Sequence, residues 1–159
     1  MILATARVLK NVIDIHVGDA TWEARPVQTE QTGVGAAIAA LFSTEYHTFV
    51  PPEAPIPHST VSYQRKNDQI RIQVGEQLWR TQSTVFGPMT IEYNGRHLTI
   101  NERLTGQFAI VEGERAVAKV QLGFRSCRID DYPGDLEPFF ANLALGYVVR
   151  TLTWENLFA

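Results

Sequence analysis

Four basic side chains are the strongest candidates for binding chemistry in this chain. Arg65 and Lys66 stand at one predicted hairpin turn and Arg96 stands at another. Arg71 alternates with apolar residues along a predicted strand, which places it on the outer face of a sheet. A convergent set of such side chains would bind a phosphate group by charge and by bidentate hydrogen bonds. The alternative is a solvated hairpin surface, because exposed charge is the rule at such positions.

One group of residues resembles an acid–base or metal site. His47 and His58 bracket a proline-rich segment, with Glu45 and Glu53 nearby. A small hydrolase or metal-dependent enzyme would need these side chains within hydrogen-bond reach in a pocket. The spacing constrains the geometry little and matches no zinc motif, so we expect a structural or surface role.

No catalytic residue, metal ligand or cofactor-binding residue is predicted. Acidic residues gather before the last apolar segment, and their spacing is not that of a calcium loop; helix capping and the helix dipole explain them. This acidic cluster consists of Asp130, Asp131, Asp135 and Glu137. Cys127 lacks the signature of a nucleophile and is expected to be a buried structural thiol.

Composition favours one soluble domain over residues 1–159. The chain has a 45% hydrophobic share and a net charge of −3, which argues against a nucleic-acid partner. No apolar run approaches the roughly 20 residues of a membrane-spanning helix. The single cysteine is compatible with a reducing cytoplasm. We therefore expect a cytoplasmic protein, peripheral to a membrane if its ligand is a lipid.

Most of the chain predicts strands. Ile70, Ile72 and Val74 alternate with polar residues, as in a half-buried strand. Asn94 and Gly95 between two alternating runs predict a two-residue hairpin turn. Roughly ten strands with short spacing are typical of an all-β barrel or sandwich. In the run Ala116–Phe124, alternate residues share one face, and a change of phase after Gly123 predicts a bulge or a bend there.

Two stretches depart from this pattern. Residues 34–43 are apolar and alanine-rich, so helix and strand both remain open. Residues 50–58 contain four prolines and are expected to form an ordered crossing loop.

A helix is predicted at about residues 136–154. Asp135 is expected to cap it, and Pro138 suits its first turn. From Phe139 to Val149 the polar side chains are Asn142 and Tyr147, so this helix has no face made for water. We therefore expect a sheet wrapped around a buried helix, with the Asn142 amide hydrogen-bonded.

The order of elements from Met89 to Leu152 resembles the tubby C-terminal-like superfamily. Its members include tubby proteins, phospholipid scramblases and LURP-one-related proteins. The likeness rests on the Tyr93–Arg96 hairpin, the Arg115–Val120 strand, and the turn at Asp130–Gly134 followed by the helix. It implies an all-β fold with one buried C-terminal helix: an antiparallel barrel of about a dozen strands around a central hydrophobic helix.

The resemblance also implies binding or membrane-associated roles. Tubby domains bind phosphoinositide headgroups through basic side chains, although no specific motif of that kind matches this sequence. The favoured function is a non-enzymatic binding domain for anionic lipid headgroups or a phosphorylated ligand, using Arg65, Lys66, Arg71 and Arg96. The alternative is a protein-interaction or regulatory scaffold that uses exposed aromatic residues such as Tyr46, Phe49 or Trp154.

Overall fold

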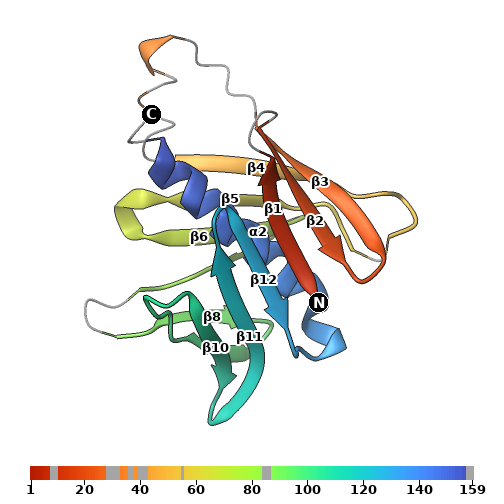
Figure 1. The fold of residues 1–159 in the computed structure, drawn as a ribbon, viewed down its shortest axis with the longest axis vertical. Helices are drawn as coiled ribbons and strands as arrows, with labels where there is room; N and C mark the ends of the chain where they lie inside the picture. Colours follow the sequence, from red (N-terminus) through yellow and green to blue (C-terminus); the bar gives the residue numbers. More distant parts are fainter. Residues whose placement is uncertain are drawn as a thin grey trace.

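Twelve antiparallel strands form one sheet that curves around a single long helix (Figure 1). The computed structural model describes residues 1–7, 11–27, 33–35, 38, 43–54, 56–83 and 87–156. The strands are β1 (Ile2–Arg7), β2 (Val12–Val17), β3 (Ala20–Pro26), β4 (Ser43–Phe49), β5 (Thr60–Gln64), β6 (Gln69–Val74), β7 (Gln77–Arg80), β8 (Met89–Tyr93), β9 (Arg96–Ile100), β10 (Gln107–Glu112), β11 (Arg115–Gly123) and β12 (Ser126–Asp130).

The strand order makes the sheet a nearly closed barrel. Sequential strands pair from β1 to β7 and from β8 to β12, and β1 pairs with β12 to join the two runs. The remaining seam, between β7 and β8, is bridged by Gln82 and Thr90, whose backbone groups exchange hydrogen bonds of 2.7 and 2.8 Å. The predicted fold class, an all-β barrel of about a dozen strands around a C-terminal helix, is confirmed.

The helix α2 (Glu137–Glu155) fills the space inside the sheet. Every side chain from Phe139 to Val149 is buried, because strands from both halves of the sheet pack against the helix. Pro138 lies in its first turn, as expected. Asp135 does not cap it: a short 3-10 turn (Gly134–Leu136) precedes the helix, and the Asp135 carboxylate instead accepts a hydrogen bond from Arg96.

Two residues fix how α2 sits against β5 and β6. The buried Asn142 amide is hydrogen-bonded, as predicted: the Ser59 hydroxyl donates to its Oδ1 at 2.5 Å. Gly146 faces Ile70 so closely that an added Cβ would lie 2.4 Å from the Ile70 Cγ2 atom. The absence of a side chain at Gly146 therefore allows β6 to approach the helix.

The end of β11 agrees with one of the two sequence alternatives. Phe124 and Arg125 form a hairpin turn, with Arg125 at φ = 51°, so the change of phase after Gly123 marks a bend into a new strand and not a bulge. The irregularity in this region lies between Ile110 and Val111 of β10. Because of that shift, Ala116 is exposed while Ala118 is buried.

The structure describes part of each of the two stretches that depart from the strand pattern. Within residues 34–43, Val34, Gly35 and Ile38 are helical and Ser43 begins β4, while the other six residues lie outside the described part. The described residues of the proline-rich segment 50–58 contain no helix or strand, and Val50 and Ile56 are buried. Among the described helices, none has the length and apolar content needed to cross a membrane.

Candidate functional site

The outer faces of β5, β6 and β7 form the surface on which the predicted basic residues can be compared. We call this surface the β5–β7 wall. Ile70 and Ile72 of β6 point into the core, so the alternation of the strand turns Arg71 outward. In the register of the sheet, Arg71 lies directly between Ser62 of β5 and Arg80 of β7.

Arg71 and Arg80 therefore form a cross-strand pair of like charges. Residues directly opposite each other have Cβ atoms about 5 Å apart, and like charges in that arrangement destabilise a sheet. Gln69 orients one of the two: its Oε1 accepts a hydrogen bond of 2.9 Å from the Arg71 Nε. Among the described residues, no carboxylate pairs with Arg71 or Arg80. The pair is thus an uncompensated cationic feature of the outer wall.

Arg96, by contrast, is neutralised by two carboxylates. Its guanidinium donates to Glu112 at 2.8 and 3.0 Å and to Asp135 at 2.9 Å. The hydrogen bond with Glu112 is the main cause of a raised pKa at Arg96, and the same contact lowers the pKa of Glu112. The arrangement is a closed ion-pair cluster at the start of α2.

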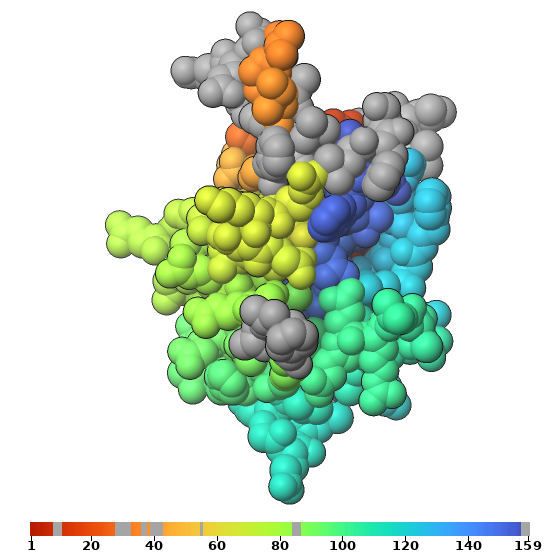
Figure 2. Space-filling view, turned by 90° about the vertical axis from the view of Figure 1, so that its left-hand side faces the viewer, coloured from red at the N-terminus to blue at the C-terminus, as the bar shows by residue number. Residues whose placement is uncertain are grey.

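The four predicted residues do not converge on one point. Arg96 contacts Asp135 just before α2, whereas the Arg65 guanidinium lies 5.4 Å from the ring centroid of Trp154 near its end. The 19 residues of α2 separate these points by about 28 Å. Figure 2 shows the end of α2 at the surface beside the β5–β6 hairpin. Arg65 and the exposed Lys66 lie in the connecting turn, so three of the four share this hairpin.

A hollow of about 560 Å³ adjoins the Arg71–Arg80 pair, and we call it the histidine hollow. It is lined by Glu45, His47, Thr48, Phe49, His58, Ser59, Thr60, Gln73 and Gly75. The His47 Nδ1 lies 2.7 Å from the Thr60 hydroxyl, and the His58 Nδ1 lies 3.1 Å from the Thr48 carbonyl oxygen. Each ring is therefore held against the sheet by Nδ1.

Glu45, His47 and His58 line this hollow without forming a proton relay. Glu45 pairs with Ser62 of β5 in the register, and Ser62 is four residues from His58, which corresponds to about 13 Å of extended chain. Both imidazoles have other partners, Thr60 and Thr48, and neither shares a hydrogen bond with Glu45. The hollow offers polar contacts to a ligand more readily than an assembled acid–base pair.

The acidic cluster before α2 is distributed among separate partners. Asp130 pairs with Arg128, Asp131 with Lys119, and Asp135 with Arg96, while the Glu137 carboxylate accepts a hydrogen bond from the Tyr132 hydroxyl. Across the ranges that the structure describes, no group of three or more acidic, histidine or cysteine side chains is arranged to hold a metal ion.

Two further expectations concern single side chains. Cys127 is buried, as predicted, and burial raises the pKa of its thiol. Tyr46 was expected to be exposed, and this is wrong. Its ring points into the core, its hydroxyl donates to the Asn11 side chain at 2.9 Å, and burial raises its pKa to about 12. Phe49 and Trp154 are exposed, at 50% and 43%.

Arg80 is the residue that the sequence interpretation missed. The signal was present: Gly75 breaks the strand, and a tight turn at Gly75 and Glu76 pairs Val74 with Gln77. Continuing that register by three residues on each strand places Arg80 opposite Arg71.

Comparison with protein-family models, with curated proteins and with solved structures finds no match for this chain. Its own geometry and its barrel architecture are therefore what bear on its function.

Proposed function

We propose that this chain is a non-enzymatic binding domain of the tubby-like type, and that its β5–β7 wall binds a phosphate group through Arg71 and Arg80. The observation that carries the proposal is the direct cross-strand pairing of two arginines that have no carboxylate partner in the described chain. Arg65 and Lys66 add positive charge at the end of the same hairpin.

The architecture supports a site on the outside of the barrel. The buried side chains of α2 occupy the interior, where a lipocalin-like barrel would hold a ligand. The histidine hollow and the Arg71–Arg80 pair both lie on the outward face of the sheet. A ligand at this wall would meet polar and charged side chains without displacing the helix.

The chemistry supports a phosphate in particular. A guanidinium offers a planar set of donors that matches phosphate geometry, and two facing guanidinium groups can share one phosphate dianion. A bound anion would also remove the repulsion between Arg71 and Arg80. The resemblance to tubby domains points in the same direction, since those domains bind phosphoinositide headgroups through basic side chains. Such a protein would act in the cytoplasm at a membrane surface.

The test is co-sedimentation of the full chain with vesicles at low and high salt. We expect no binding to neutral phosphatidylcholine vesicles and binding to vesicles that contain phosphatidylserine or phosphoinositides, with a loss of binding as salt increases. The double variant R71Q/R80Q should reduce binding at least tenfold. Competition with a soluble phosphate monoester distinguishes a free phosphorylated ligand from a lipid surface.

The control is R103Q/R115Q, which removes the same net charge at two exposed positions outside the wall. This variant should bind as the unmodified protein does. Equal losses in the two double variants would show that net charge, and not the Arg71–Arg80 pair, determines binding. Absence of binding to every vesicle and to the soluble phosphate would refute the proposal.

A further inference from the structure

The histidine hollow is continuous with the phosphate-binding wall. Thr60 and Gln73 line the hollow and face each other across β5 and β6. Two residues further along the same outer face, Ser62 and Arg71 form the next such pair. A ligand at Arg71 thus lies beside the hollow, and a larger anionic ligand would extend into it.

His47 and His58 lie on the same outer face as diagonal neighbours. His47 is directly opposite Thr60 in the register, and the backbone N–H of Thr48 donates to the Ser59 carbonyl, so the next position places Phe49 beside His58. Diagonal cross-strand neighbours are about 7–8 Å apart, within reach of aromatic side chains. The two imidazoles therefore contribute to one local potential.

Both rings can gain a proton without losing their contacts to the sheet. The His58 Nδ1 donates to a carbonyl oxygen, which requires the proton to be on Nδ1 and leaves Nε2 to receive the second proton. The Thr60 hydroxyl can accept from the His47 Nδ1, so that contact also persists in the imidazolium. A protonated imidazole at either position carries a positive charge and a second N–H donor for an anion.

Charged groups of both signs surround the hollow. Arg25 of β3 lies directly opposite His47 in the register, stacks 4.7 Å from the Phe49 ring centroid and is itself paired with Glu23. The remaining groups are Glu45 on β4, Arg71 on β6 and Glu76 in the turn after β6. The two histidines are thus flanked by charges of both signs, and a proton on either imidazole adds a positive charge to this surface.

We infer that the histidine hollow is a second anion-binding subsite, occupied when His47 and His58 are protonated, so that the wall accepts a ligand carrying two separated anionic groups. This inference rests on the proposed function for the first group, at Arg71 and Arg80. The second group would contact the imidazolium rings together with the Thr60 hydroxyl and the Gln73 amide.

The experiment is a titration of the full chain with inorganic sulfate at pH 7.5 and 5.5, followed by amide NMR shifts. Sulfate keeps its charge over this range, whereas phosphate does not. We expect the affinity for sulfate to increase on the order of fivefold at pH 5.5 and low salt. Shifts at pH 5.5 should include residues of the hollow. H47Q/H58Q should lose the increase and keep the affinity measured at pH 7.5.

Two controls separate this inference from the proposed function. H16Q removes a histidine in a similar cross-strand contact, with the His16 Nδ1 3.0 Å from the Thr21 hydroxyl, and should leave the increase intact. R71Q/R80Q should lose binding at pH 7.5 and keep shifts in the hollow at pH 5.5. If H47Q/H58Q retained the full increase, the subsite would be wrong. If R71Q/R80Q kept its binding at pH 7.5, the proposed function would be contradicted instead.

Discussion

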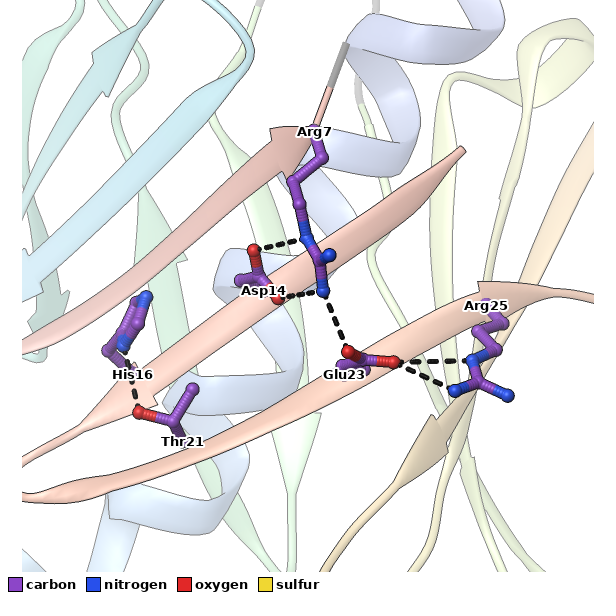
Figure 3. A network of polar contacts seen from close by, with 6 residues as sticks. All are labelled: Arg7, Asp14, His16, Thr21, Glu23 and Arg25. Atoms are coloured by element: carbon purple, nitrogen blue, oxygen red, sulfur yellow. Dashed lines mark hydrogen bonds and ion pairs between the residues drawn. The ribbon is translucent and has the colours of Figure 1, made fainter. Parts of the chain in front are cut away.

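The outer walls over β1–β3 and over β5–β7 are built alike and carry charge in opposite ways. On β1–β3 the guanidinium of Arg7 lies 2.7 Å from Asp14 and 2.7 Å from Glu23, and Glu23 also pairs with Arg25 at 3.0 Å (Figure 3). Two cations and two anions thus form one ion-pair network across three neighbouring strands. On β5–β7 the corresponding outward positions hold Ser62, Arg71 and Arg80, with no anion among them.

The two walls differ in how far their charges are compensated. The β1–β3 network compensates its own charge: Asp14 and Glu23 raise the pKa of Arg7, while Arg25 and Arg7 lower the pKa of Glu23. Its cations are already occupied and have little to offer a ligand. The β5–β7 wall keeps a repulsion that an anion would relieve, which is the basis for the proposal that this wall binds the ligand.

The largest effect should follow from Leu145→Asp, which disrupts the packing of α2 inside the sheet that forms both walls. Leu145 is fully buried on α2, and an unpaired charge there should destabilise the protein by more than about 4 kcal/mol. We expect the cooperative thermal transition by circular dichroism to disappear. The control is Leu104→Asp at a fully exposed position, which should melt as the unmodified protein does. An unchanged transition in L145D would contradict the buried helix.

Gly146→Ala should disturb the packing of α2 against β5 and β6 and leave its packing against the β1–β3 wall unchanged. The added methyl would contact Ile70 of β6 and Val61 of β5, and such overpacking typically lowers the free energy of unfolding by about 1–3 kcal/mol. Chemical denaturation measures the loss, and NMR shifts should be concentrated on β5 and β6. Gly134→Ala is the control, since its Cβ would meet nothing within 4 Å. Equal stability of the two variants would contradict the close approach of Ile70 to Gly146.

Glu23→Gln should weaken the β1–β3 wall and leave anion binding unchanged. It removes the shared partner of Arg7 and Arg25, and a solvent-exposed ion pair of this kind contributes little to the free energy of unfolding. Because the folded state lowers the pKa of Glu23, its contribution is present above the ordinary pKa of a glutamate, about 4.3, and is lost as pH falls through the lowered value. Urea denaturation at pH 7 and pH 3 should therefore show a smaller gap in the free energy of unfolding between variant and parent at pH 3 than at pH 7. A gap that persists unchanged at pH 3 would mean that charge pairing is not its cause.

The smallest effect on stability should come from Arg80→Glu. The informative result is whether the free energy of unfolding increases or decreases. Replacing a like-charge pair by an ion pair with Arg71 should increase the free energy of unfolding by roughly 0.2–1 kcal/mol, while anion binding is lost. Denaturation and sulfate titration of the same sample measure the two effects. A variant that is less stable than the parent would show that Arg71 and Arg80 do not repel each other.

The barrel and its helix could be predicted because local patterns specify them. The apolar run Phe139–Val149 has no polar face, and the alternation around Ile70 and Ile72 identifies a half-buried strand. The site was harder to predict, because it depends on which strands become neighbours. Arg71 was identified by its place in the alternation, but its partner Arg80 required the register of the β6–β7 hairpin.

Arg96 also shows that contacts between residues distant in the sequence are hard to predict. In the sequence it looks like the other turn arginines, and its neutralisation depends on Glu112 and Asp135, which are 16 and 39 residues away. Tyr46 was misjudged for a similar reason, since its burial follows from the inward side of β4 and not from its polar neighbours.

The most direct test of the account is an NMR titration of the arginine Nε–H resonances with inorganic phosphate at low salt and pH 7.5. The four resonances to compare belong to Arg71 and Arg80 on one wall and to Arg7 and Arg25 on the other. The account predicts saturable shifts for Arg71 and Arg80 and none for the carboxylate-paired Arg7 and Arg25. Equal shifts at all four, or larger shifts on the β1–β3 wall, would contradict the assignment of binding to the unpaired arginines.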